Sequence, residues 1–357
     1  MKKIISLLLS ISLLLSVGTA LTACGERKGD PSKKEYQTQT KTISYSYFNT
    51  VSVMSSYGKA SEDEFSFYVS IADELLGKYH KLFDIYYEYS GVNNIRTINK
   101  NAGKSAVVVD PELIDFLEYC KQLYTITSGK TNIMLGSVLR IWHDHREIAS
   151  NDPAKATVPA TSSLEAASKH AGIDLLVIDK EAGTVYITDP EASIDVGAIG
   201  KGYATEKLSQ KLRALGADSI ALNIGGNLRT IGSKPDGSKW TTGITNPNPL
   251  SSQSFVCRVA IADTSLVTSG DYERFYMVDG VKYHHIIDPV TLMPAKYFSS
   301  VSIFTDNSSL ADALSTALFC MSYEDGLSLV KTIGGVDVLW VSYDGSYKHT
   351  DGVEIID

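Results

Sequence analysis

Two oxygen-bearing side chains at helical spacing are the first residues in this sequence with the chemistry of a polar site. Asp312 and Thr316 lie four residues apart in "SLADALSTALF", so a helix places their carboxylate and hydroxyl on one face. Such hard oxygen donors suit Mg²⁺ rather than zinc. Taken alone, the pair also fits an acid in a first helical turn beside a packed hydroxyl.

A pair of histidines in "YHHIIDP" offers one proton carrier. Neighbouring side chains of a strand point to opposite faces, so His284 and His285 cannot both enter one site. The inward histidine of such a pair is a candidate general base, although a lone histidine in a strand is often structural. His143 and His145 in "RIWHDHRE" diverge on a helix, which argues against a metal pair there.

The glycine turn in "IDVGAIGKGYATEKL", residues 194–208, has the wrong spacing for both common phosphate loops. A Walker loop needs a glycine where Asp195 stands, and the order of Gly197, Gly200 and Gly202 reverses the dinucleotide fingerprint. Lys201 and the N-terminus of the following helix favour an anion at this turn. A sharp strand-to-helix connection without a ligand is the alternative.

Two further glycine turns follow predicted strands. "LNIGGNLRTIG" places Asn227 at a tight bend, and "TSGDYERF" leaves Ser269, Gly270 and Asp271 at a strand end. Together with the oxygen pair and one usable histidine, these turns predict a site for a large anionic ligand with Mg²⁺.

The elements that position these groups alternate irregularly between helices and hairpins. This order predicts an α+β fold with mixed, largely antiparallel sheets and packed helices. Several start and stop signals support it: a strand pair within 44–58, capping boxes at Ser61–Glu64 and Ser162–Glu165 (the latter helix closed by Gly172), Asp110-Pro111 before a helix, helices over 131–143 and 309–321, a strand from Ile194, and a hairpin turn at Asp279-Gly280.

The N-terminus has the pattern of a bacterial lipoprotein signal. Two lysines, an apolar run and small residues precede "LTAC", so residues 1–23 are expected to be a signal peptide and Cys24 the lipid-bearing residue. The polar stretch 24–41 is expected to be a flexible tether, followed by one domain over 42–357. The predicted location is the extracytoplasmic side of a bacterial cell membrane.

Composition narrows the possible partners. A formal net charge of −8 argues against nucleic acid. Cys120, Cys257 and Cys320 stand among apolar residues without CxxC spacing, so we expect buried free thiols rather than disulfides or a zinc cage.

The five motifs together resemble the ApbE-type flavin transferases. "IDVGAIGKGYATEKL" is similar to that family's D-x-G-x-x-x-K-G stretch, and "LNIGGNLRTIG" to its N-x-G-G-N segment. "TSGDYERF", "HHIIDP" and "ADALSTAL" are similar to its T-S-G-x-Y, H-I-I-D-P and A-D-A-x-x-T-A elements. The resemblance implies an ApbE-like, T-fold-related domain over most of residues 45–345.

The resemblance also implies roles for individual residues. Asp312, Thr316 and the carbonyl of Ala198 fall where the family binds its metal, and Tyr86 where a tyrosine faces the flavin ring. The remaining positions that it assigns to FAD contacts are Asp195, Lys201, Ile286, Phe48, Lys130, Thr131 and Asn132. Of these, Phe48 begins the segment corresponding to the family's M-G-T, and Gly129–Asn132 correspond to its G-A-F-D. Its D-P-x-T-G turn ends in Leu292 here.

The activity implied is Mg²⁺-dependent cleavage of FAD and transfer of FMN to a threonine or serine of an acceptor protein, with release of AMP. The expected acceptors carry an FMN-binding domain, as in Rnf- or Nqr-type redox subunits or other extracytoplasmic flavoproteins. His285 is the expected general base, with Asp271 or Asp288 as alternatives. A Mg²⁺-dependent FAD pyrophosphatase and a non-catalytic flavin-binding lipoprotein remain the alternative functions.

Overall fold

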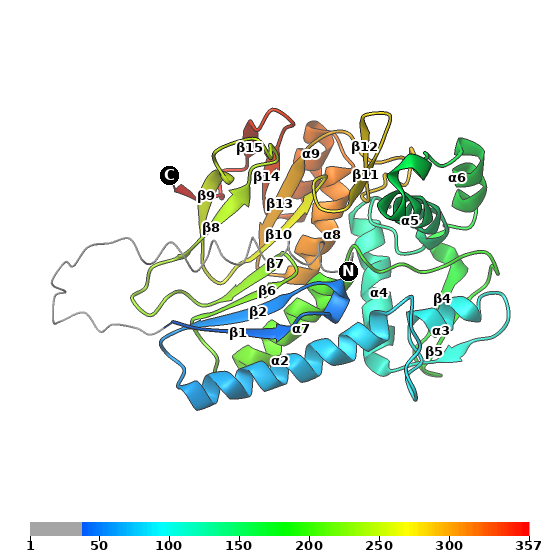
Figure 1. The fold of residues 1–357 in the computed structure, drawn as a ribbon. Coiled ribbons are helices and arrows are strands. Elements are labelled where there is room, and N and C mark those ends of the chain that lie inside the picture. Colours follow the sequence, from blue (N-terminus) through cyan, green and yellow to red (C-terminus); the bar gives the residue numbers. More distant parts are fainter. Residues whose placement is uncertain (1–37, 357) are drawn as a thin grey trace, which may run out of the picture. The chain divides into compact units, whose positions relative to one another are not determined.

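A computed structural model describes residues 38–356 and shows an α+β fold built on one large sheet (Figure 1). The predicted signal peptide, Cys24 and most of the tether lie outside the described residues. Each neighbouring strand pair of the large sheet is antiparallel. Its order is β1 (Thr38–Ser44), β2 (Ser52–Tyr57), β6 (Ile220–Ile224), β7 (Asn227–Ile231), β10 (Ser265–Gly270), β13 (Ser300–Thr305), β14 (Asp337–Val341) and β15 (Tyr347–His349).

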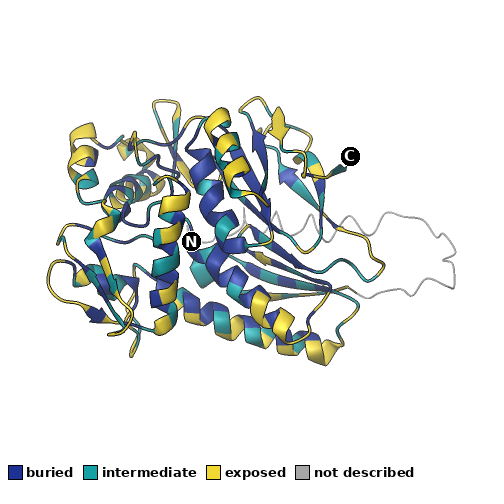
Figure 2. Cartoon of the chain, turned by 180° about the vertical axis from the view of Figure 1, so that it is seen from behind, coloured by how far each residue is buried: buried dark blue, intermediate teal, exposed yellow. Residues whose placement is uncertain are grey.

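Helices cover one face of this sheet. They are α2 (Glu62–Phe83), α7 (Gly200–Ala214), α8 (Ser308–Phe319) and α9 (Tyr323–Ile333). Helix α8 is buried along most of its length, and Figure 2 shows it mostly dark blue. Because its first turns pack against both α7 and the strands, any polar group on α8 is positioned by the core itself.

A small sheet packs on the opposite face. It has the order β16 (Ile355–Ile356), β9 (Phe255–Ile261) and β8 (Trp240–Thr245). Trp240 and Val259 join Leu266 of β10 and Leu339 of β14 in one hydrophobic cluster. The large sheet is therefore covered on both faces.

The rest of the described chain forms a second layer of short elements beside the sheet. They are α3 (Ile95–Lys100), α4 (Pro111–Ile126), α5 (Gly136–Asn151), α6 (Thr161–Ser168), the sheet of β3 (Val107–Val108), β5 (Thr184–Ile187) and β4 (Leu176–Asp179), and the hairpin of β11 (Phe275–Val278) and β12 (Val281–His284). Trp142 of α5 stacks on Tyr283, which stacks on Tyr276, and this joins α5 to the hairpin. No helix within residues 38–356 combines the length and apolar character needed to cross a bilayer.

Several local predictions are confirmed. The capping box of Ser61 and Glu64 begins α2, and Asp110 caps α4 with Pro111 in its first turn. Asp279 and Gly280 adopt positive φ angles of 47° and 79° between β11 and β12, as a tight hairpin turn requires. Strand β1 begins at Thr38, four residues before the predicted start of the domain.

Two helix boundaries differ from the prediction. The helix expected over 131–143 is α5, which begins at Gly136, because Thr131 and Asn132 donate hydrogen bonds to remote carbonyls and hold this segment in a turn. Helix α6 begins at Thr161 without a capping side chain, and Leu164 anchors it in the cluster around Trp142. The capping box predicted at Ser162–Glu165 is therefore absent.

Two smaller expectations also need correction. The strand predicted from Ile194 is an irregular segment with one bridge, between Leu135 and Ser193. All three cysteines of the described chain are free, as expected, but only Cys120 and Cys320 are buried, while Cys257 lies half-buried on β9.

Candidate functional site

The crossing of α7 and α8 holds the predicted metal carboxylate. Asp312 is 4% exposed, and its Oδ2 accepts a hydrogen bond of 2.7 Å from the backbone N–H of Gly202. A Cβ at position 202 would lie 2.4 Å from both the Asp312 Cβ and the Ser308 carbonyl. Glycine here therefore permits close approach of two helices, which fixes the carboxylate.

The same hydrogen bond changes the start of α7. In a helix continued backward, the Gly202 N–H would bond the carbonyl of Ala198, four residues earlier. Because this N–H donates to Asp312 instead, the Ala198 carbonyl is left outside the helical ladder. Lys201 Nζ lies 3.6 Å from Asp312 Oδ1, so the lysine, the carboxylate and the carbonyl gather at one crossing.

The donor set at this crossing suits a hard cation. Thr316 lies one turn beyond Asp312 on α8 and is half-buried, and within residues 38–356 its hydroxyl has no hydrogen-bond partner. The described chain has no group of three or more His, Cys, Asp or Glu that could hold a metal. One carboxylate with a hydroxyl and a carbonyl fits Mg²⁺, which usually retains several waters and needs few protein ligands.

The two histidines have different surroundings. His284 is buried, its Nε2–H donates to the Ala295 carbonyl at 2.8 Å, and its Nδ1 accepts from the Ile286 N–H at 3.2 Å. The Nδ1 of His285 is buried without a hydrogen-bond partner in the described structure. Burial and the charges of Arg274 and Arg146 lower the pKa of His285 to about 3. His285 is therefore a neutral imidazole with a free nitrogen, whereas His284 is structural.

The two alternative bases are each paired with a lysine. Asp271 accepts from Lys282 Nζ at 3.0 Å and from the Ser299 hydroxyl at 2.9 Å, and it lines a cavity of about 310 Å³ together with His284. Asp288 accepts from Lys130 Nζ at 2.9 Å. Since both carboxylates are already paired, His285 Nδ1 is the acceptor atom that remains free. Its low pKa makes it a weak base until an anion offsets the charges of the nearby arginines.

The tyrosine assigned to the flavin ring lies beside the irregular segment that precedes α7. Tyr86 is 44% exposed, and its ring centroid is 5.5 Å from that of His143 on α5. Burial raises the pKa of Tyr86, and the charge of Asp195 adds to the rise. Of the neighbouring tyrosines, Tyr89 is bonded to Asp84 and His80, and Tyr87 is 69% exposed. Tyr86 is thus the tyrosine of this group that faces Asp195.

Asp195 is the acidic member of this group. Its Oδ1 accepts from the Gly197 N–H at 2.8 Å. Burial raises the pKa of Asp195, against the opposing effects of that hydrogen bond and of nearby His143, Arg274 and Arg146. Since Ala198 is only three residues away, the Tyr86 group adjoins the α7–α8 crossing.

The other predicted contact residues use their side chains within the fold. Lys130 pairs with Asp288, the Thr131 hydroxyl donates to the Ala313 carbonyl at 2.7 Å, and the Asn132 amide donates to the Ala171 carbonyl at 2.8 Å. Ile286 is buried in the cluster beneath α8, and Phe48 packs edge-on against His80. These side chains position the loops around the site.

Two arginines at the site, Arg146 and Arg274, are not among the residues predicted from the sequence. Both influence the pKa values of Tyr86, Asp195 and His285. Arg146 stands in "RIWHDHRE" and Arg274 in "TSGDYERF", so each lies in a motif whose other residues carried the prediction.

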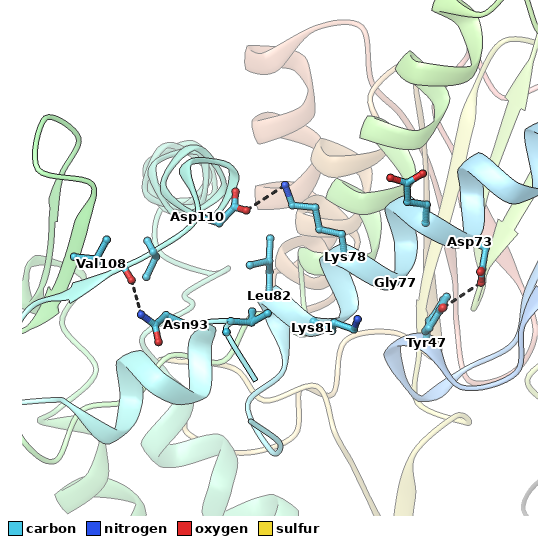
Figure 3. A pocket seen from close by; sticks show the side chains of 13 residues that line it. Tyr47, Asp73, Gly77, Lys78, Lys81, Leu82, Asn93, Val108 and Asp110 are labelled. Atoms are coloured by element: carbon cyan, nitrogen blue, oxygen red, sulfur yellow. Dashed lines mark hydrogen bonds and ion pairs between the residues drawn. The ribbon is translucent and has the colours of Figure 1, made fainter. Parts of the chain in front are cut away.

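A separate cavity of about 650 Å³ lies along α2, where Figure 3 shows Tyr47, Asp73, Lys78, Asn93 and Asp110 around it. None of the predicted site residues lines this cavity. It is not the site assembled by α5, α7 and α8.

Comparisons with known proteins agree with this fold. A sequence model described as the ApbE family matches residues 22–340. A protein of Treponema pallidum (strain Nichols) named FAD:protein FMN transferase is 34% identical over 275 residues, which cover 72% of this chain and 73% of that protein. A protein of the same name from Haemophilus influenzae is 24% identical over 93% of this chain and 91% of its own length.

Solved structures agree as well. The crystal structure of the ApbE protein of Thermotoga maritima has a TM-score of 0.75 at 26% identity and covers 88% of this chain and 97% of that one. The flavin transferase ApbE of Vibrio cholerae has a TM-score of 0.71 at 23% identity, with 89% and 98% covered, and it supports the fold. The chain belongs to the ApbE family and is an enzyme.

Proposed function

We propose that this chain is a Mg²⁺-dependent FAD:protein FMN transferase that attaches FMN through a phosphoester to a threonine or serine of an acceptor flavoprotein. The observation that carries the proposal is a neutral His285 with an unpartnered Nδ1, placed among cations beside the Asp312 crossing. The name of the Treponema relative supports the same reaction.

The reaction breaks one bond and forms one bond at phosphorus. The acceptor hydroxyl attacks the phosphorus on the FMN side of FAD, the phosphoanhydride bond breaks, and AMP leaves with the electron pair. His285 takes the hydroxyl proton at Nδ1. Asp312, Thr316 and the Ala198 carbonyl would hold Mg²⁺, which offsets negative charge developing on the leaving phosphate.

Lys201 has a second charge-balancing role in this proposal. Its ammonium group lies close to Asp312 Oδ1 and at the first turn of α7, where a polyanion is favoured by charge and by unpaired backbone N–H groups. Lys201 therefore binds the pyrophosphate, while Asp195 and Tyr86 face the rest of the ligand.

The deciding experiment weighs the acceptor. The chain is incubated with FAD, Mg²⁺ and an FMN-binding domain that carries an acceptor threonine, and the acceptor mass is then measured. We expect a gain of one FMN, which a chelator or replacement of that threonine by valine abolishes. Free FMN and AMP with unmodified acceptor would instead identify a pyrophosphatase. Unchanged FAD throughout would identify a flavin-binding protein without catalysis.

The location of the enzyme is part of the proposal. The signal pattern before Cys24 supports a lipid-anchored enzyme on the extracytoplasmic face of a bacterial membrane. The Cys24→Ala variant is expected to leave the membrane fraction, and retention of this variant in the membrane would contradict the anchor.

A further inference from the structure

The guanidinium of Arg146 is oriented by its own helix. Its Nη2 lies 2.8 Å from His143 Nδ1, and because arginine only donates, this nitrogen must be the acceptor. The His143 proton is then on Nε2, which lies 3.5 Å from Glu147 Oε1. A carboxylate, an imidazole and a guanidinium on one face of α5 therefore form a chain of contacts that ends at Arg146.

Arg146 and Arg274 form an uncompensated pair of cations. Within residues 38–356, neither guanidinium forms an ion pair with a carboxylate, whereas Arg96 and Arg213 pair with Glu88 and Asp263. Burial lowers the pKa of Arg146, and the charge of Arg274 lowers it further. Two like charges that lie close together without a carboxylate partner favour a bound anion.

The acids near this pair balance it only in part. Glu147 is exposed and is in contact with His143. Asp195 faces the two arginines and offsets part of their charge, although burial raises its pKa. Lys201 also acts on His285, but its ammonium group lies 3.6 Å from Asp312 Oδ1. The two guanidiniums therefore remain without an ion-pair partner of their own.

Phe275 pairs with His284 in the β11–β12 hairpin, so Arg274 and His285 lie at the same end of it. Helix α5, which carries Arg146, packs on this hairpin through the stacked rings of Trp142 and Tyr283. This position beside His285 indicates which anion the pair binds. A general base lies within hydrogen-bond reach of the attacking hydroxyl, and that hydroxyl must approach the phosphorus that it attacks. We infer that Arg146 and Arg274 bind the phosphate of the FMN half of FAD, the group that is transferred. This inference rests on the proposed function, and Arg274 joins the site from the turn after β10.

The phosphate contact can be tested with two ligands that differ only in that group. FMN carries the phosphate and riboflavin lacks it. Neither ligand is transferred when a chelator is present and no acceptor protein is added. The affinities of the full chain and of Arg146→Gln and Arg274→Gln for both ligands are measured by equilibrium dialysis. We expect each variant to weaken FMN binding by roughly tenfold to a hundredfold and to leave riboflavin binding unchanged, since charge-assisted hydrogen bonds contribute about 1.5–3 kcal/mol.

Arg140→Gln is the matched control, because Arg140 lies on the same helix but is largely exposed beside Asp144. It should leave both affinities unchanged. His143→Gln tests the chain of contacts: as a positioning change it should weaken FMN binding less than Arg146→Gln does. Thermal unfolding of each variant checks the fold, and we expect no loss of stability when one of two like charges is removed.

Two results would overturn the inference. Equal weakening of FMN and riboflavin in the arginine variants would place the guanidiniums against the flavin ring. Unchanged FMN binding in both variants would mean that the pair binds no phosphate. These binding assays involve no turnover, so they test the phosphate contact independently of catalysis. A failure of FMN transfer in the acceptor experiment would contradict the proposed function, but it would not contradict a phosphate contact that the binding assays support.

Discussion

The α7–α8 crossing and the junction of α5 with the β11–β12 hairpin bring opposite kinds of residue to the site. At the crossing, Asp312 is buried and bonded to the Gly202 backbone, and the helices pack too closely for any Cβ at position 202. At the junction, Arg146 and Arg274 have no carboxylate partner in the described structure, and His285 Nδ1 has no hydrogen bond. The crossing is part of the hydrophobic core, while the junction carries charged groups without an ion-pair partner.

Because the two regions differ in this way, substitutions in the crossing and in the junction should have different effects. A change of backbone packing at the crossing should disturb folding and chemistry together. A change at the junction should alter ligand binding or proton transfer with little cost in stability, because its polar groups form few interactions with the described chain and are available to the ligand. The following predictions test this division.

The largest effect is expected from Asp312→Asn. Asparagine keeps the shape and an oxygen that accepts from the Gly202 N–H, but it removes the charge that would bind Mg²⁺. Since metal charge stabilisation is worth several kcal/mol, the rate of FMN transfer should fall on the order of a thousandfold. Initial rates against Mg²⁺ concentration measure this, with the exposed Asp306→Asn as the control. Wild-type rates in Asp312→Asn would remove Asp312 from the metal site.

The adjacent histidines should respond in opposite ways. His285→Asn is expected to lower transfer by about a hundredfold with an unchanged free energy of unfolding, because it removes a general base without a structural partner. His284→Asn should instead cost about 1–3 kcal/mol of stability, because a buried donor and acceptor lose their geometry. Urea unfolding and initial rates of both variants distinguish the general base from the structural histidine. A loss of stability in His285→Asn together with a loss of rate in His284→Asn would exchange the two assignments.

Gly202→Ala tests the crossing through the backbone alone. The added Cβ would force α7 and α8 apart, and overpacking of this kind costs about 1–3 kcal/mol. Urea unfolding measures the loss. Gly172→Ala is the matched control, since the nearest atom to its Cβ is 3.6 Å away and its φ is −68°, and it should change stability by less than about 0.5 kcal/mol. Equal stability of the two variants would contradict the tight crossing.

The effect that is smallest at neutral pH concerns stability in acid. Burial and two arginines hold the pKa of His285 at about 3, below the ordinary value of 6.5. As the pH falls, the unfolded chain therefore binds a proton at this histidine before the folded chain does. The contribution of His285 to the free energy of unfolding is complete above pH 6.5 and is lost between pH 6.5 and 3. His285→Asn should reduce this loss by at most about 1.4 kcal/mol per pH unit. Parallel stability curves for the variant and the wild type would disprove the shift.

The elements that the sequence predicted correctly depend on neighbouring residues. The Ser61–Glu64 box, the Asp110-Pro111 start and the Asp279-Gly280 turn each arise from contacts within four residues. The start of α5 was wrong because Thr131 and Asn132 bond to carbonyls far along the chain, which local patterns do not report. The motif resemblance proposed site roles for Asp312 and Tyr86, yet it gave no reason to consider Arg146.

The sequence by itself determined the family, the α+β class and the helical spacing of Asp312 and Thr316, because these follow from residue types at short separations. Tertiary structure alone decided that the Gly202 N–H bonds a carboxylate 110 residues away, that His284 is satisfied while His285 is not, and that Arg274 and His285 come to the same end of the β11–β12 hairpin. Each of these depends on distance between segments that only the packed chain brings together, and distance governs both hydrogen bonding and charge interaction.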